Sequence, residues 1–241
     1  MDNSNSVILW DIEATNLKAS FGYVLCVAWK KLGQKTVNVR SVADYATYKK
    51  DPTNDKQLLK DVRDVLSDAG AWVTWYGQGF DQKFVNSRLT LHGMSPLPPV
   101  PHIDGWRIAR EKLLLHSNRL ASVSSFLGIE EKTALSGPIW VKASAGDKKS
   151  LDYVVRHCKQ DVVVLEQAYE RIKHLATSGP NLAAIIGNSP ANSCPRCGLS
   201  DKLQKRGTRI ASAVKYQRFQ CQGCGGWSLG KPERIKNVLA R

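Results

Sequence analysis

Five residues in three separate stretches of the chain have side chains that could hold metal ions and accept a proton. Asp11 and Glu13 lie in "WDIEATN", Asp81 lies in "GQGFD", and His157 and Asp161 lie in "HCKQDV". Converging carboxylates bind Mg²⁺ or Mn²⁺, and two such ions about 3.5–4 Å apart stabilise the attacking and leaving oxygens of a phosphodiester. A neutral histidine can take up a proton. These residue types predict metal-dependent phosphodiester cleavage, provided that the fold brings the three stretches together.

Each stretch also has an explanation that involves no chemistry. Asp11 and Glu13 stand two apart on an expected strand, so both could face one metal or simply solvate the strand end. Asp81 stands where a helix begins and could be its N-cap. His157 and Asp161 are four residues apart on an expected helix and could form an ordinary surface pair. These alternatives stay open on the sequence alone.

Apolar runs predict the strands of a mixed α/β sheet. Three runs follow one another at hairpin spacing and indicate consecutive, largely antiparallel strands: residues 6–16, 22–31 and 35–43. A fourth run covers residues 71–77, and residues 102–104, after a proline-rich connector, indicate a short edge strand. Asp11 and Glu13 are thereby expected at the end of the first strand.

Segments with helical spacing of apolar residues alternate with these strands. Five segments show the spacing: residues 54–70, 81–93, 105–115, 118–128 and 148–176. The last is expected to bury Leu151, Val154, Val155, Cys158, Val162, Leu165 and Ala168 or Tyr169. The order of strands and helices predicts one mixed sheet flanked by helices.

Four cysteines near the C-terminus form two CxxC pairs. Cys194 and Cys197 lie in "CPRCG", and Cys221 and Cys224 follow in "CQGCGGW" after 23 intervening residues. Two such pairs can complete a tetrahedral Cys₄ site for one structural Zn²⁺, and a β-hairpin fits the insert. The alternative is four unrelated free thiols. A closed Cys₄ site has no open coordination position, so this zinc is expected to stabilise a small ribbon and to do no chemistry.

Positive charge is concentrated in the same C-terminal segment. The chain carries a formal charge of +14, of which residues 179–241 contribute +9. Such segments bind nucleic acid, although a membrane surface or plain solubility would explain the same charge. The residues expected to contact phosphates or bases are Lys205, Arg206, Arg209, Lys215, Arg218 and Trp227. A solvated face and hairpin packing are the alternatives for the charges and the aromatic rings.

These patterns divide the chain into three parts. Residues 1–178 form the α/β domain, residues 179–192 a linker, and residues 193–241 the zinc ribbon with its basic tail. No apolar run reaches the roughly 18 residues that a membrane span needs, and the N-terminus lacks the features of a secretory signal. We therefore expect a cytoplasmic protein without a membrane partner.

Taken in order, the three acidic stretches resemble the motifs of the DEDD exonucleases of the ribonuclease H-like superfamily. The resemblance covers about residues 7–175. Within the family, the sequence is most similar to small exonuclease-like proteins encoded by bacteriophages. For a phage-encoded protein, the expected location is the host cytoplasm. It implies a ribonuclease H-like sheet and two Mg²⁺ or Mn²⁺ ions. The ligands that it implies for these ions are Asp11, Glu13, Asp81 and Asp161.

Two positions depart from the family pattern. His157 stands four residues before Asp161, a spacing typical of the subclass that has tyrosine in its place. The asparagine often found shortly before the second-motif aspartate is absent, with Tyr76 and Gln78 nearest. At neutral pH a tyrosine, with a pKa near 10, can orient a metal-bound water but is a poor base, whereas a histidine, with a pKa near 6.5, can accept the proton directly. Our hypothesis is that His157 is the general base.

The sequence thus predicts a metal-dependent nuclease joined to a zinc ribbon that raises its affinity for nucleic acid. By resemblance, the activity would be that of a 3′–5′ exonuclease, on DNA in preference to RNA. An endonuclease or a ribonuclease on the same scaffold is the alternative among enzymes. An inactive nucleic-acid-binding or regulatory protein is the alternative outside them, supported only by the altered third motif. Protein partners stay unspecified.

Overall fold

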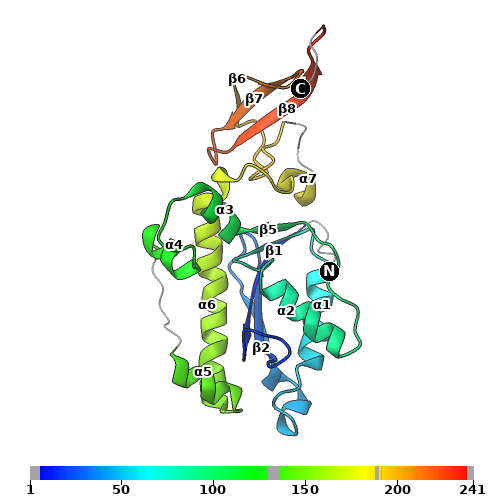
Figure 1. Ribbon diagram of the computed structural model, residues 1–241, viewed down its shortest axis with the longest axis vertical. Helices are drawn as coiled ribbons and strands as arrows, with labels where there is room; N and C mark the ends of the chain where they lie inside the picture. Colours follow the sequence, from blue (N-terminus) through cyan, green and yellow to red (C-terminus); the bar gives the residue numbers. More distant parts are fainter. Residues whose placement is uncertain (1–5, 130–135, 188–189, 191, 238–241) are drawn as a thin grey trace.

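The strands form two sheets, one in the body of the molecule and one near its C-terminus (Figure 1). The computed structural model describes residues 6–129, 136–187, 190 and 192–237. The body sheet has five strands and the C-terminal sheet has three. The predicted sheet of the body and the predicted small C-terminal ribbon are both present.

The body sheet has the strand order β3-β2-β1-β4-β5. Its strands are β1 (Val7–Ala14), β2 (Val24–Lys31), β3 (Asn38–Ser41), β4 (Ala71–Thr74) and β5 (His102–Asp104). The first three are antiparallel, as predicted, whereas β4 and β5 run parallel to β1. Since β4 pairs only with Val7–Leu9 of β1, the second half of β1 extends past its neighbour. Asp11 and Glu13 lie on this extension.

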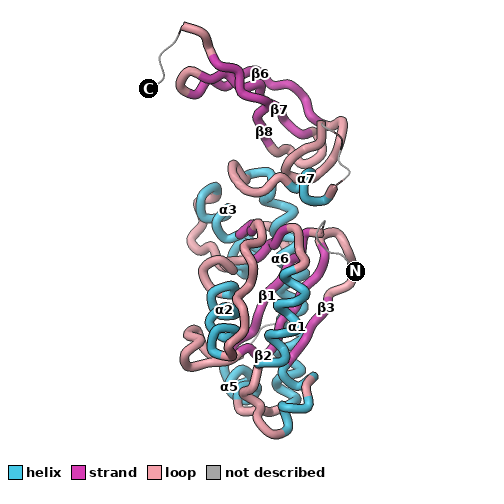
Figure 2. The backbone as a smooth tube through the Cα atoms, turned by 90° about the vertical axis from the view of Figure 1, so that its right-hand side faces the viewer, coloured by secondary structure: helices cyan, strands magenta, loops and turns pink. Residues whose placement is uncertain are grey.

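Helices cover both faces of the body sheet. Their bounds are α1 (Lys56–Ser67), α2 (Asp81–Leu91), α3 (Gly105–Lys112), α4 (Leu120–Phe126), α5 (Gly137–Ser144) and α6 (Lys148–Ile172). Figures 1 and 2 show α6 on one face and α1 with α2 on the other. Short 3₁₀ turns follow β3 (η1, Val42–Asp44; η2, Ala46–Lys49) and α6 (η3, Lys173–Leu175). Helix α5 was not predicted, because its apolar residues Ile139, Trp140 and Val141 are consecutive and show no helical period.

Helix α6 is fixed against the sheet by its apolar face and by one ion pair. Seven of its predicted core positions are buried, namely Leu151, Val154, Cys158, Val162, Leu165, Ala168 and Tyr169. Burial of one such apolar side chain stabilises a fold by about 1.5–3 kcal/mol. Lys30 of β2 forms an ion pair with Glu166, which also accepts a hydrogen bond from the Gly33 amide at 2.7 Å. These contacts set the position of His157 and Asp161.

A second buried network joins β2, α1 and α2. The Asp55 carboxylate, at the start of α1, is fully buried. It accepts hydrogen bonds from the Val24 amide at 3.0 Å and from Arg88 Nε and Nη2 at 2.9 Å each. His92 Nε2, at the end of α2, lies 2.7 Å from Asp55 Oδ1. The network fixes α2, which begins at Asp81.

The C-terminal sheet is an antiparallel meander of β6 (Leu203–Ala211), β7 (Val214–Cys221) and β8 (Trp227–Arg234). Strands β6 and β7 form the predicted hairpin. The third strand was not predicted, because Gly230 and Pro232 interrupt its pattern.

The segment that we expected to be a linker contains a short helix, α7 (Leu182–Ile186). Its Leu182 is part of the hydrophobic core of the body, and Ala183 beside it is buried. In the described part of the chain, every helix is too short or too polar to cross a membrane.

Candidate active site, zinc site and nucleic-acid interface

Asp11 and Glu13 occupy the extension of β1 beyond β4. Glu13 is buried and Asp11 is half-buried. Alternation along the strand directs both carboxylates to one face of the sheet, and this is the face that α6 covers, because their oxygens lie close to side chains of α6. The Cys158 thiol of α6 donates to the Asp11 carbonyl oxygen at 3.6 Å. The two acids therefore lie between strand and helix and do not merely solvate a strand end.

Asp81 reaches the same place from the helix on the opposite face. Its Oδ1 accepts a hydrogen bond from the Ile12 amide, between the two acids of β1, at 3.2 Å. Helix α2 begins at Asp81 itself, with Phe80 in the N-cap position. The carboxylate is thus bound to the edge of β1, and the alternative of a helix N-cap is wrong.

His157 and Asp161 complete the cluster from α6. His157 Nε2 lies 3.4 Å from Asp161 Oδ2 and 3.9 Å from Glu13 Oε1. The side chains of His157 and Asp161 are 18% and 31% exposed, so water can reach both. Because Glu13 shares their surroundings, the two residues are part of a larger group and are no isolated surface pair.

The carboxylates of this cluster repel one another when they are ionised. Burial raises the pKa of Asp81 to about 7, and the charge of Asp104 adds to the effect. Burial also raises the pKa of Asp11 and of Glu13 well above their usual values, and repulsion from Asp81 and Asp161 raises both further. A divalent cation would relieve this repulsion.

The donor set fits Mg²⁺ or Mn²⁺. Both ions prefer carboxylate oxygens, and the three elements supply four carboxylates. The Cys158 sulfur also lies within 4.8 Å of ligand atoms of Asp11 and Glu13. Burial raises the pKa of this thiol well above its usual value, and a neutral thiol is a poor ligand for a hard cation. Cys158 therefore packs beneath the acids, a position that its neighbourhood in the sequence did not reveal.

Asp104 shapes the loop that leads to Asp81. Its carboxylate accepts hydrogen bonds from the amides of Tyr76 at 2.8 Å, Gln78 at 3.2 Å and Trp106 at 3.1 Å. Within this loop, a Cβ at Gly79 would lie only 2.5 Å from the Tyr76 ring. A side chain at position 79 would therefore force the Tyr76 ring to move, and Asp104 acts on the site through backbone geometry.

An apolar groove opens beside Glu13. It has a volume of about 570 Å³ and is lined by the segment 12–17, Phe80 and Trp140. Trp140 comes from α5, a helix that sequence periodicity did not predict. The groove places aromatic surface directly next to the acids.

Comparisons with known proteins agree with the fold of the body. A family model described as the RNase_H superfamily matches residues 8–173, more than half of the chain. The chain belongs to the RNase H superfamily. The match contains all five residues of the acidic cluster and ends before the four cysteines of the two CxxC pairs. A search of curated proteins gave no match for this RNase H superfamily member.

A solved structure shares the same fold. The RNase H superfamily domain is similar to the family B DNA polymerase from the hyperthermophilic archaeon Pyrobaculum calidifontis, with a TM-score of 0.55 and 15% sequence identity. The similarity covers 75% of this chain and 27% of that chain, so the chain spans about a quarter of the polymerase's length. At this identity the similarity concerns the fold alone.

Outside the RNase H superfamily domain, the four cysteines converge at one point. The sulfur atoms of Cys194, Cys197, Cys221 and Cys224 lie within 4.8 Å of one another. The distances from Cys194 to Cys224 and from Cys197 to Cys221 are both 3.8 Å. A tetrahedron with Zn–S bonds of about 2.3 Å has edges of about 3.8 Å. The cluster fits one structural Zn²⁺, and four unrelated thiols would not converge in this way.

The expected nucleic-acid-binding residues divide between the two faces of the ribbon sheet. Arg209 pairs with Tyr216, two positions before Arg218, and Gln220 pairs with Trp227. Strand alternation therefore places Arg209, Arg218 and Trp227 on one face. Lys205 pairs with Phe219, and Lys215 lies in register with it on the other face. Arg206 lies at the irregularity between Lys205 and Thr208, so its face is not defined by pairing.

Proposed function

We propose that the chain is a two-metal nuclease of the DEDD type that removes nucleotides from the 3′ end of DNA. The observation that carries the proposal is that Asp11, Glu13, His157 and Asp161 lie together between β1 and α6. The Asp81 carboxylate of α2 binds the β1 backbone between the two acids of that strand. Membership of the RNase H superfamily supports nucleic acid as the substrate. The order of the three motifs and the residues in them support exonuclease action and its 3′–5′ polarity.

The roles follow from the position of each side chain. Asp11, Glu13, Asp81 and Asp161 would hold two Mg²⁺ or Mn²⁺ ions. When bound, these ions would stabilise the charge on the attacking and leaving oxygens of the phosphodiester. His157 would take the proton of the attacking water, and the Asp161 carboxylate 3.4 Å away would stabilise the charged imidazole.

The apolar groove beside Glu13 supports action at a strand end. Phe80 and Trp140 offer ring surface on which an unpaired base could stack. A terminal nucleotide is unpaired more easily than one inside a duplex, so a groove of this kind favours an end as substrate.

The test offers linear single-stranded DNA labelled at either end, circular single-stranded DNA, duplex DNA and RNA, each with Mg²⁺ or Mn²⁺. We expect linear DNA to shorten from its 3′ end and circles to stay intact, with no cleavage by Asp11→Asn. Cleavage of circles would instead show an endonuclease, and faster loss of RNA a ribonuclease. Absence of metal-dependent cleavage on every substrate would contradict the proposal and favour an inactive binding protein.

A further inference from the structure

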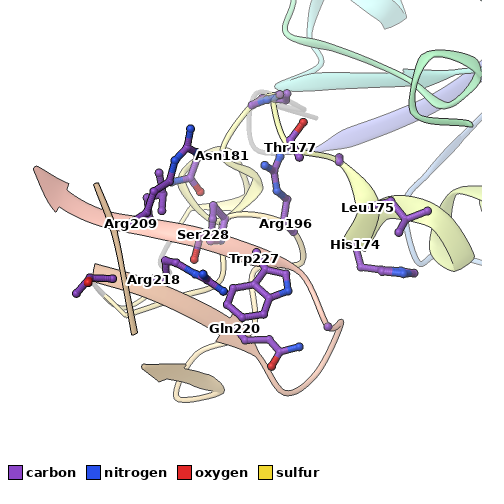
Figure 3. A pocket seen from close by; sticks show the side chains of 17 residues that line it. His174, Leu175, Thr177, Asn181, Arg196, Arg209, Arg218, Gln220, Trp227 and Ser228 are labelled. Carbon is purple, nitrogen blue, oxygen red and sulfur yellow. The ribbon is translucent and has the colours of Figure 1, made fainter. Parts of the chain in front are cut away.

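A cleft of about 1140 Å³ lies between the end of α6 and the ribbon sheet (Figure 3). The body and the segment after it contribute His174, Leu175, Thr177 and Asn181 to its walls. The ribbon contributes Arg196, Arg209, Arg218, Gln220 and Trp227. The cleft lies away from the acidic cluster and plays no part in the metal binding and proton transfer proposed for that cluster.

Direct hydrogen bonds hold the two walls of the cleft together. Arg196, in the first CxxC pair, donates from Nη1 to the Ser178 carbonyl oxygen at 2.9 Å. The Leu182 amide donates to the Pro195 carbonyl oxygen at 2.8 Å. Since the Leu182 side chain is buried in the body core, the ribbon is attached to the body through packed residues. The cleft is therefore a built feature of the fold.

The walls of the cleft are positively charged. Three arginines line it, and none of its described lining residues is acidic. By contrast, Lys205 and Lys215 lie on the other face of the sheet. A concave surface with one sign of charge concentrates ligands of the opposite sign.

Trp227 gives this surface an aromatic platform. The Arg218 guanidinium lies 4.5 Å from the centre of the indole ring. The tryptophan nevertheless remains 42% exposed, and it lines the cleft (Figure 3). Arginine together with an exposed ring is the combination that binds the phosphates and bases of single strands. A base can stack on the indole only when it is not stacked inside a duplex.

A smaller cavity lies next to the cleft and reaches the loop before Asp81. It has a volume of about 120 Å³ and shares Ala176, Thr177 and Gly179 with the cleft. Its charged lining residues are of both signs: Asp104, Arg107, Glu111 and Lys112. Asp161 lies eleven residues before the end of α6, about 16 Å at 1.5 Å per residue. At about 3.4 Å per nucleotide of a helical strand, this corresponds to about five nucleotides.

We propose that the cleft binds a single-stranded segment of nucleic acid about five or more nucleotides from the end held at the acidic cluster. Arg209 and Arg218 contact its phosphates, and one base stacks on Trp227. Binding by the cleft stands on its own geometry, whereas the position of the cleaved end rests on the proposed function. If both proposals hold, the preferred substrate is a strand that stays single-stranded from the acidic cluster to the cleft.

Binding is measured on the full zinc-loaded chain carrying Asp11→Asn, by fluorescence anisotropy with single-stranded oligonucleotides of about 12 nucleotides. We expect Trp227→Ala to weaken binding by about tenfold, and Trp227→Phe to recover part of the loss. Arg209→Ala and Arg218→Ala should each weaken binding and lower the slope of log Kd against log salt by about one.

The comparison variants are Lys205→Ala and Lys215→Ala, which remove the same charge from the other face. They should weaken binding less than Arg209→Ala and Arg218→Ala do. Lys35→Ala, in the exposed turn between β2 and β3, controls for net charge. Zinc content and the melting temperature confirm that each variant is folded.

Equal losses from both faces, or no loss from Trp227→Ala, would overturn the inference. So would tighter binding of duplex DNA, or of an acidic peptide, than of the single strand. Trp227-dependent binding without any cleavage would refute the proposed nuclease and leave the cleft site standing. Cleavage together with binding that Trp227→Ala does not weaken would refute the cleft site and leave the proposed nuclease standing. With Asp11 intact, Trp227→Ala should raise KM for long oligonucleotides and leave KM unchanged for those shorter than about five nucleotides.

Discussion

The clustered carboxylates make the metal-free chain less stable than its core would allow. The pKa values of Asp11, Glu13 and Asp81 are raised by burial, and those of Asp11 and Glu13 also by the neighbouring acids. A carboxyl with a raised folded-state pKa binds more protons in the folded chain than in the unfolded one. Its contribution to stability is therefore present below the unfolded pKa near 4 and is lost as pH rises, for Asp81 through about 7.

This repulsion predicts that Asp11→Asn stabilises the metal-free chain. At neutral pH the free energy of unfolding should rise by about 1–2 kcal/mol, because one buried charge is removed. Urea unfolding at pH 5 and pH 7.5 measures the effect, which should be smaller at the lower pH. Asp152→Asn, an exposed acid on α6, is the control. Mg²⁺ should raise the melting temperature of the unmodified chain and not that of Asp11→Asn; an equal rise in both would contradict a metal site here.

His157 is expected to act on turnover and not on metal binding. His157→Ala should lower kcat by about 10²–10⁴-fold, because a positioned general base contributes about that factor. The rise in melting temperature caused by Mg²⁺ or Mn²⁺ should remain. Steady-state kinetics and thermal unfolding in parallel test both parts. Full activity of His157→Phe would exclude a proton-accepting role.

At the scale of elements, α2 delivers Asp81, and the far end of α2 is fixed by a buried ion pair. Arg88→Ala would leave the fully buried Asp55 carboxylate without its main partner. Loss of one partner from a buried pair costs about 3–5 kcal/mol. Urea unfolding measures the cost. Arg63→Ala, which breaks the more exposed pair with Asp64 on α1, should cost about 1 kcal/mol or less. Similar costs for both variants would mean that Asp55 is compensated elsewhere.

The ribbon is an element whose stability depends on its metal. β6 and β8 consist largely of exposed residues, and only Cys221 of β7 is buried. The ribbon therefore buries little apolar surface, and zinc binding is expected to supply on the order of 10 kcal/mol. Cys221→Ser should lose the bound zinc and make residues 193–241 sensitive to protease, while the body keeps its own unfolding transition. Metal analysis and limited proteolysis test this expectation. A protease-resistant ribbon without zinc would contradict it.

At the scale of the whole molecule, a test of what the ribbon contributes depends on where the body ends. Leu182 of α7 belongs to the body core, so removal of residues 179–241 would expose apolar surface. Gly187, with a φ of 75°, ends α7. A truncation after this glycine keeps the core intact.

Removal of residues 188–241 should leave the body folded and weaken its binding of nucleic acid. The ribbon raises the local concentration of substrate at the acids, so its loss should raise KM and flatten the salt dependence while kcat stays nearly constant. Kinetics at several salt concentrations, with circular dichroism as the check on folding, measure both effects. An unchanged KM and salt slope would remove the ribbon from substrate binding.

The local patterns of the sequence predicted most of the elements and the acidic and cysteine residues that the structure brings together. Hairpin spacing gave β1 to β3, helical spacing gave α1, α2 and α6, and the CxxC pairs gave the cysteine cluster. Segments with weak local signals were missed: α5 and α7 are short, and β8 contains glycine and proline. Trp140 was missed together with α5.

What the sequence by itself determined is therefore the set of residues and their local geometry, because periodicity and motif spacing act over a few residues. Only the tertiary structure decided which of them meet. Asp81 binds the Ile12 amide across 69 residues of chain, and Arg218 faces the cleft while Lys215 does not. Such contacts depend on strand register and on helix packing, whose free energy is spread over the whole core. No local pattern carries that information.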